Sequence, residues 1–229
     1  MDRDTGPIGG IENPLPATKQ LLMVSNLMDL LALFFSIIIS WFFTAGILIY
    51  ILASRAYSAR SIRIKKYPIA GYLLVTICQG CLTWILVYHG CSVEKLQSFP
   101  VLPVVAAGLL IGGFYPLTQV YQHEQDRKDG VTTISMLLGY KGTFLFTAVV
   151  YSAAMALLFI HFEKTGQVMN FLILASIMLP VLVYFFKWTA GVWKDYRRAD
   201  FKHAMRMNLL ASVCTNLGFI IILIGRYFE

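Results

Sequence analysis

Long apolar runs alternate with short polar segments along almost the whole chain. The first run extends from about Thr18 to Tyr57, which is too long for one helical crossing of a hydrocarbon layer about 30 Å thick and suits two. A break near Ser40 and Trp41 would divide this run, because tryptophan favours the membrane interface. Further runs cover Pro68–His89, Phe99–Tyr121, Gly142–Phe162, Val168–Trp188 and His203–Tyr227. The pattern predicts an all-α, polytopic transmembrane helical bundle of about seven spans, forming one domain over residues 1–229.

Composition and charge agree with a membrane protein. The chain is 58% hydrophobic and 14% charged, against about 25% charged residues in a typical soluble domain. If the N-terminus is cytoplasmic, 16 of the 19 lysines and arginines fall on the cytoplasmic side, and only Lys95, Lys164 and Arg226 lie outside. The positive-inside rule explains this asymmetry. We therefore expect an integral protein of the cell (plasma) membrane whose active face is cytoplasmic. The net charge of +7 gives no reason to expect nucleic acid, since no basic and aromatic residues interleave on one surface.

Two features inside the apolar runs each allow two interpretations. Asp29 is an intramembrane carboxylate, which is a candidate functional residue by default. The simpler interpretation is that it pairs with Asn26 or with a neighbouring helix. Cys78 and Cys81 form a CxxC, which could hold zinc or undergo redox chemistry. Buried cysteines that pack as small hydrophobic residues are the simpler interpretation.

Acidic residues concentrate just after the run that ends near Tyr121. If the helix continues, Gln122, Asp126 and Asp129 share one face, and Glu124 lies off that face unless the helix ends there. Carboxylates this close repel each other, and a bound divalent cation relieves the repulsion. Oxygen ligands suit Mg²⁺, which takes one or two carboxylates together with waters and substrate phosphates.

A second acidic group, Asp2 and Asp4, lies on the same side of the membrane in this topology. Two acidic groups at one end of a helical bundle could hold one diphosphate through Mg²⁺ ions. Basic residues on the same side could neutralise the remaining phosphate charge; they are Arg60, Arg63, Lys65, Lys66, Arg127 and Lys128. The alternative is that these charged loops are merely solvated and set the membrane orientation.

Residues 122–139, QHEQDRKDGVTTISMLLG, resemble the second aspartate-rich motif of the UbiA-type membrane prenyltransferases. Asp126 matches the second acid of that motif and Glu124 the intervening one, whereas Gln122 replaces the first acid. The N-terminal DRDTGPIGG resembles the end of the family's first motif. Asp2 matches the acid of that motif and Asp4 stands beside it.

Two further segments carry the resemblance over essentially the whole chain. Residues 56–68 are similar to the family's loop that combines a tyrosine, here Tyr57, with basic residues. Where members often carry a lysine, this chain has Ser61, so Arg60, Arg63 and Lys65 compete for the phosphate-binding role. Residues 201–208 resemble the entry to the last span. The family usually has nine spans, so the resemblance implies a member that lacks the first two helices or has a misplaced start.

The resemblance implies Mg²⁺-dependent transfer of an isoprenyl group from a prenyl diphosphate to a lipophilic or aromatic acceptor, in quinone or lipid biosynthesis. Catalysis would fall to Glu124 and Asp126. Aromatic faces such as those of Tyr57 and Tyr121 would stabilise an allylic cation. The implied metal ligands are Asp2, Asp4, Glu124, Asp126 and Asp129. The implied substrate-binding residues are Tyr57, Arg60, Arg63, Lys65, Tyr121, Gln122, Arg127 and Lys128.

Two other classes of function remain open at this level. A transporter would carry functional polar residues near the bilayer midplane, and the chain offers few, namely Asp29, Asn208 and Asn216. A catalytically inactive membrane subunit or fragment would share the fold without the turnover. The acceptor is equally open between a quinone-ring precursor, a haem or chlorophyll-type precursor and a phosphosugar.

Overall fold

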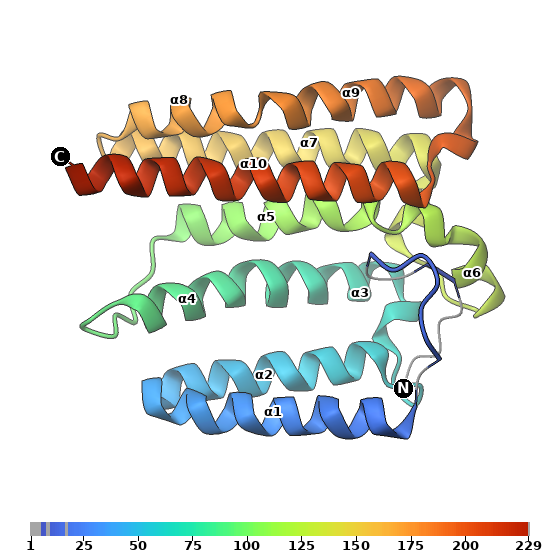
Figure 1. Cartoon of the computed structure of the whole chain (residues 1–229), viewed down its shortest axis with the longest axis horizontal. Helices are drawn as coiled ribbons and strands as arrows, with labels where there is room; N and C mark the ends of the chain where they lie inside the picture. The colour runs from blue at the N-terminus through green and yellow to red at the C-terminus, as the bar shows by residue number, and fades with distance from the viewer. Residues whose placement is uncertain (1–5, 8–9, 17, 229) are drawn as a thin grey trace.

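A computed structural model describes residues 6–7, 10–16 and 18–228, and its regular elements are helices lying roughly side by side (Figure 1). Four short helical segments connect or interrupt the longer helices: η1 (Ile64–Lys66), η2 (Thr76–Leu82), η3 (Val120–Gln122) and η4 (Tyr196–Arg198). The longer helices are α1 (Lys19–Ile39), α2 (Trp41–Ser58), α3 (Pro68–Val75), α4 (Thr83–Cys91), α5 (Val101–Leu117), α6 (His123–Lys128), α7 (Ile134–Lys164), α8 (Val168–Ile177), α9 (Leu179–Lys194) and α10 (Phe201–Phe228).

The predicted all-α membrane fold is confirmed. In the described part of the chain, five helical stretches are long and apolar enough to cross a membrane, and the pair α8–α9, bent by 44°, adds a sixth where the pair is counted as one span. Helix α2 is not among them, so the count of seven spans stays a prediction. Many large apolar side chains face outward, Leu30 and Phe34 on α1 being more than half exposed. A surface of this kind is suited to lipid.

The hairpin of α1 and α2 breaks at Ser40, where the sequence predicted a break. The Ser40 backbone is extended, its hydroxyl accepts a hydrogen bond from the Phe43 amide at 3.0 Å, and it also contacts His89 Nε2 at 2.7 Å. Away from this turn, toward the open end of the hairpin, Arg55 of α2 pairs with Asp29 of α1. This ion pair agrees with the simpler interpretation of Asp29, that it pairs with a neighbouring helix.

The span from α3 to α4 contains a π-helical segment, η2, that packs closely on α5. Gly80 is the contact point, because a Cβ there would lie 2.5 Å from the Gly108 Cα and 2.9 Å from the Ala107 carbonyl oxygen. Cys78 and Cys81 lie in the same segment as free thiols. Among the described residues no group of three His, Cys, Asp or Glu side chains gathers to hold a metal, so nothing here supports a zinc site at the CxxC.

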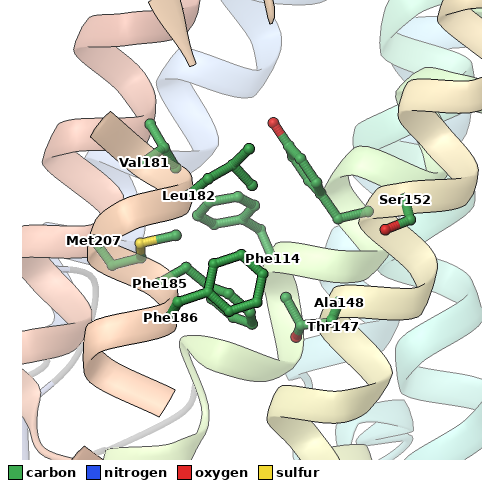
Figure 2. A pocket seen from close by; sticks show the side chains of 10 residues that line it. Phe114, Thr147, Ala148, Ser152, Val181, Leu182, Phe185, Phe186 and Met207 are labelled. Atoms are coloured by element: carbon green, nitrogen blue, oxygen red, sulfur yellow. The ribbon is translucent and has the colours of Figure 1, made fainter. Parts of the chain in front are cut away.

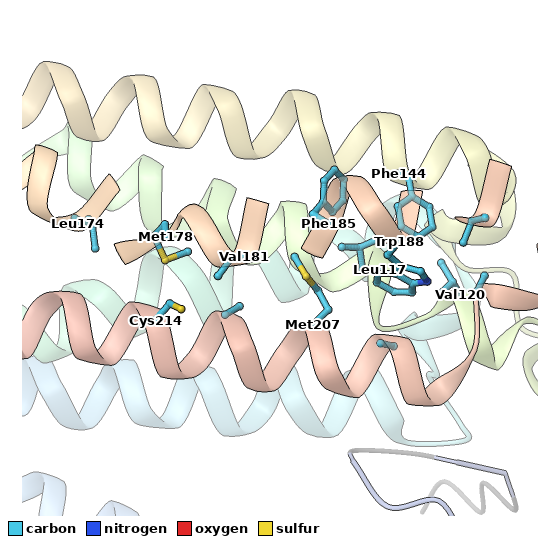
Figure 3. Close-up of a cluster of buried hydrophobic side chains, with 14 of the residues drawn as sticks. Leu117, Val120, Phe144, Leu174, Met178, Val181, Phe185, Trp188, Met207 and Cys214 are labelled. Carbon is cyan, nitrogen blue, oxygen red and sulfur yellow. The ribbon is translucent and has the colours of Figure 1, made fainter. Parts of the chain in front are cut away.

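A cluster of buried apolar side chains lies between α5, α7, α8, α9 and α10 (Figure 3). Phe144 of α7 meets Trp188 of α9 edge to face, with ring centroids 4.8 Å apart. The Trp188 indole donates a hydrogen bond to the Arg198 carbonyl oxygen at 2.7 Å. Aromatic residues with satisfied polar atoms suit such a core. This packing gives α7 a fixed position, on which the site described below depends.

We predict that Gly80→Ala destabilises the protein by about 1–3 kcal/mol, because the added methyl group meets backbone atoms that cannot move aside. The midpoint of thermal unfolding in detergent would fall. Gly225→Ala is the matched control: no atom lies within 4 Å of the added Cβ, and helix propensity favours alanine by about 1 kcal/mol. Equal midpoints for Gly80→Ala and the wild type would contradict the close packing of η2 on α5.

Candidate functional site

The predicted site residues gather at one end of the bundle. Helix α2 ends at Ser58 and α3 begins at Pro68, while α5 ends at Leu117 and α7 begins at Ile134. Because these helices alternate in direction, both connecting segments lie at the same end, where α6 and residues 10–16 also lie (Figure 1). The fold therefore brings the basic α2–α3 loop next to the acidic α5–α7 connection.

Helix α6 directs its two central carboxylates to different sides. Asp126 is 8% exposed, whereas Glu124 is exposed to solvent. Residues two apart on a helix do not face each other. The helix of the preceding span does not continue into this segment as expected, since α5 ends at Leu117 and Gln122 and Asp129 flank α6 as its caps. Within α6, the helix runs past Glu124 to Lys128, so Glu124 stays off the face of Asp126. The structure thus places Asp126 toward the bundle and Glu124 away from it.

Tyrosine hydroxyls lie near the Asp126 carboxylate. The hydroxyls of Tyr57 and Tyr115 form a hydrogen bond with each other. The carboxylate of Asp126 lies within electrostatic range of the hydroxyls of Tyr115 and Tyr121. Tyr57 and Tyr115 also line a cavity of about 120 Å³ that reaches into the bundle as far as Gln79. This buried carboxylate between phenols is the chemical centre of the candidate site.

Gln119 adds an oxygen to this centre. Its side chain is 5% exposed and lies beside the Tyr115 hydroxyl. Its carbonyl oxygen Oε1 is buried without a hydrogen-bond partner among the described residues. A buried acceptor without a donor is costly, and a cation or a donating ligand group would satisfy it.

Asp129 and Arg63 form a contact of their own. Arg63 adopts a left-handed backbone conformation with φ 49° at the start of η1. Its guanidinium donates to the Asp129 carbonyl oxygen at 3.1 Å and approaches the Asp129 carboxylate at 3.8 Å. The side-chain amide of Gln125 also donates to that carboxylate, at 3.4 Å. This contact links the basic loop to the acidic connection. It pairs Asp129, a predicted metal ligand, with Arg63, a predicted phosphate-binding residue.

The N-terminal segment reaches the acidic connection through Gln122. The Gln122 amide donates to the Pro7 carbonyl oxygen at 3.3 Å and to the Tyr121 hydroxyl at 3.1 Å. Gly6 lies against Gln125, since a Cβ on Gly6 would be 3.6 Å from Gln125 Cγ. The residue that replaces the first acid of the motif thus joins the two motif segments. Asp2 and Asp4 lie outside the described residues.

The remaining predicted residues surround this centre at greater exposure. Tyr57, Lys65 and Tyr121 are half-buried, and Tyr121 packs edge to face against Phe201 with ring centroids 5.2 Å apart. Arg60, Arg127 and Lys128 are exposed. The sequence reasoning missed Tyr115, Gln119 and His123. Tyr115 and Gln119 are four residues apart, and Gln119 is seven residues before Asp126. In a continuous helix this spacing puts all three side chains on one face, and that pattern is the signal that could have found them.

The donor set suits a hard cation that keeps water and phosphate ligands. A closed metal site of three or more protein side chains is absent from the described part of the chain. Mg²⁺ does not need one, because it is commonly held by one or two carboxylates plus substrate phosphates. The Asp126 carboxylate and the unpartnered Gln119 oxygen are ligand types that Mg²⁺ accepts.

Fold and site together define a polytopic membrane protein with an oxygen-rich, acidic centre at one end of an apolar helical bundle. The sequence profile of the UbiA prenyltransferase family matches residues 11–210, and the chain belongs to that family. The resemblance found in the sequence is thereby confirmed.

A solved structure agrees with this assignment. The chain is similar to a UbiA homolog from Archaeoglobus fulgidus bound to Cd²⁺, with a TM-score of 0.59 and 19% identity, covering 90% of this chain and 74% of that one. At this identity the similarity shows the shared fold. No curated protein sequence matches the chain significantly.

We predict that Arg63 and Asp129 stabilise the protein as a pair. Arg63→Ala and Asp129→Ala should each lower the unfolding midpoint in detergent, and the double variant should lose about 1 kcal/mol less than the sum of the two, as expected for residues in contact. The exposed Arg60 supplies the control, since Arg60→Ala combined with Asp129→Ala should be additive. Additive effects of Arg63→Ala and Asp129→Ala would show that the two side chains act separately.

Proposed function

We propose that this protein transfers an isoprenyl group from a prenyl diphosphate to a lipophilic, aromatic acceptor, in a Mg²⁺-dependent reaction at the cytoplasmic face of the plasma membrane. The observation that carries the proposal is the buried Asp126 carboxylate among tyrosine hydroxyls, at the polar end of an apolar bundle of the UbiA family. The product would enter quinone or lipid biosynthesis.

Asp126 is the proposed metal ligand on the second motif, with Gln119 beside it and Glu124 as a more peripheral acid. Asp2 and Asp4 are proposed to hold a second ion. Asp4 stands three residues before Pro7 in the sequence, and the Pro7 carbonyl oxygen accepts a hydrogen bond from Gln122. The Archaeoglobus homolog was determined with a divalent cation, Cd²⁺, which supports a cation in this role. When bound, Mg²⁺ supplies positive charge and Lewis acidity that stabilise the departing diphosphate.

The chain's own side chains would complete the site around the diphosphate. Lys65, Arg60 and the α6 bases Arg127 and Lys128 would offset its remaining negative charge. In the hydrogen-bonded pair of Tyr57 and Tyr115, the hydroxyl that accepts within the pair would keep its own proton to donate to a phosphate oxygen. The C–O bond to diphosphate breaks, and the allylic carbon bonds to the acceptor ring, which then loses a proton. The apolar bundle excludes the water that would otherwise trap the cation, and the rings of Tyr57 and Tyr121 would stabilise it.

A groove between η2, α4, α5 and α10 offers room for the lipophilic acceptor. Its volume is about 740 Å³, within the range of roughly 300–1,000 Å³ typical of small-molecule sites. Gln79 lines both this groove and the cavity at Tyr57 and Tyr115, so the two spaces adjoin at this amide. The described lining carries amides, hydroxyls and aromatic rings but no charged side chain. That chemistry favours a neutral aromatic acceptor over a phosphosugar.

A smaller cavity beside the groove does not compete as a site. It has a volume of about 60 Å³ and is enclosed mainly by apolar side chains, among them Leu182 and Phe185 (Figure 2). Phe114 and Tyr151 line both spaces. Its size and lining suit a packing defect next to the groove.

We predict that Asp126→Asn weakens Mg²⁺-dependent binding of radiolabelled farnesyl diphosphate at least about tenfold, which corresponds to about 1.4 kcal/mol. The amide keeps the shape of the carboxylate and removes its charge. Binding to the purified protein is measured with Mg²⁺ and with a chelator in its place.

Asp195→Asn is the matched control, because this exposed acid caps η4 and asparagine can cap as well. Its binding should equal that of the wild type. If the folded wild-type protein binds no prenyl diphosphate with Mg²⁺, the proposal fails and an inactive member of the family becomes the better interpretation. Binding that survives in Asp126→Asn would remove Asp126 from the metal site.

A further inference from the structure

The acidic helix α6 is short, and the turn at Thr118 and the 3-10 segment η3 interrupt the regular α-helix between it and α5. It spans His123–Lys128, whereas isolated helices shorter than about 12–15 residues are marginal in water. Which side chain of α6 faces the bundle must therefore be decided by contacts with the rest of the protein. A rotation of α6 by half a turn would exchange the positions of Asp126 and Glu124.

His123, the first residue of α6, makes a buried polar contact with α7. It is 7% exposed, and its Nε2 lies 2.8 Å from the hydroxyl of Ser135. The Ser135 hydroxyl is in turn 3.0 Å from the Thr143 hydroxyl. Ser135 and Thr143 are both fully buried. The His123 ring also packs on Tyr140, with ring centroids 4.7 Å apart.

The local backbone explains how Ser135 and Thr143 meet although they are eight residues apart. Gly139 interrupts α7 with φ 66° and ψ 174°, a conformation that glycine adopts without strain. The first turn of α7 is thereby folded back on the long part of the helix, and the Thr143 hydroxyl donates to the Gly139 carbonyl oxygen at 2.7 Å. Further along the long part, Thr147 donates to the Gly113 carbonyl oxygen of α5 at 2.8 Å. His123 is therefore anchored to a rigid part of the bundle.

His123 and Asp126 lie on the same side of α6. They are three residues apart, which places them on neighbouring positions of one helical face, and both are buried while Glu124 is exposed. A contact that fixes the rotation at His123 thus keeps Asp126 inward. Nothing in this arrangement brings the imidazole to the cavity lined by Tyr57 and Tyr115.

We propose that His123 is a positioning residue: through its bond to Ser135 it sets the rotation of α6 that presents Asp126 to the metal–diphosphate site. The proposal rests on the proposed function for the identity of the ligand. Its structural part, the anchoring of α6 by the His123–Ser135 contact, stands independently of that function.

The first arm of the test measures the Mg²⁺ dependence of farnesyl diphosphate binding. His123→Ala and Ser135→Ala should each raise the Mg²⁺ concentration for half-maximal binding about tenfold. Saturating Mg²⁺ should restore binding, because the carboxylate is still present. The double variant should resemble either single variant, since both remove one contact. His123→Gln, which keeps a hydrogen-bonding group, should recover part of the Mg²⁺ affinity that His123→Ala loses. His161→Ala, at the far end of α7, is the control and should bind as the wild type does.

A merely structural role for His123 would lower the unfolding midpoint and the amount of binding-competent protein without moving the Mg²⁺ dependence, and that result would overturn the proposal. An unchanged Mg²⁺ dependence with unchanged stability would overturn it as well.

The second arm needs no ligand and separates this proposal from the proposed function. Amide hydrogen exchange of residues 123–131 should rise in His123→Ala and Ser135→Ala and stay at the wild-type rate in His161→Ala. If the wild type binds no prenyl diphosphate, the proposed function fails, and exchange alone decides whether His123 anchors α6. Equal exchange in all four proteins would refute the anchoring.

Discussion

The hydrocarbon layer forces polar chemistry to the ends of this fold or into satisfied pairs. Inside the layer no water is present to hydrogen-bond an exposed polar group, so each such group needs a partner within the protein. The Asp29–Arg55 pair and the His89–Ser40 contact follow this rule in the α1–α2 region. The acidic connection follows it in another way, because α5 ends at Leu117 before the first of its carboxylates. The same constraint that builds the bundle thus concentrates the charged chemistry at one end of it.

Helical periodicity and run length were sufficient for most of the fold. The break at Ser40 could be predicted because a polar residue and a tryptophan stand in the middle of a run that is twice the length of one span. The π-helical segment η2 and the fold-back at Gly139 could not be predicted. The first depends on how a helix meets its neighbour, Gly80 against Gly108. The second depends on how the first turn of α7 meets the rest of the same helix, Ser135 against Thr143. Neither contact leaves a local signal, since glycine, serine and threonine are common in membrane helices.

The candidate site shows the same division between local and distant information. The sequence shows only that the acids at 124, 126 and 129 lie on one connecting segment. Which of them faces the bundle depends on the rotation of a six-residue helix, and that rotation is decided by His123 and by residues of α7. The pairing of Arg63 with Asp129 joins positions 66 residues apart, and it rests on a left-handed backbone at Arg63 that no propensity favours. Composition could identify the two loops as basic and acidic, but not the contact between them.

Gln122 shows how this chain departs from the family pattern without losing the connection between the two motifs. An acid at this position would stand one helical turn from the buried Asp126, and two like charges at low exposure would repel each other unless a cation lay between them. The amide removes that repulsion and can donate, and it does so to the Pro7 carbonyl oxygen. A carboxylate could not donate this bond at neutral pH. The amide at this position therefore links the two segments directly and leaves Asp126 as the one inward carboxylate on α6. Because the inward charge of α6 rests on this single residue, the rotation of α6 matters to the chemistry proposed for it.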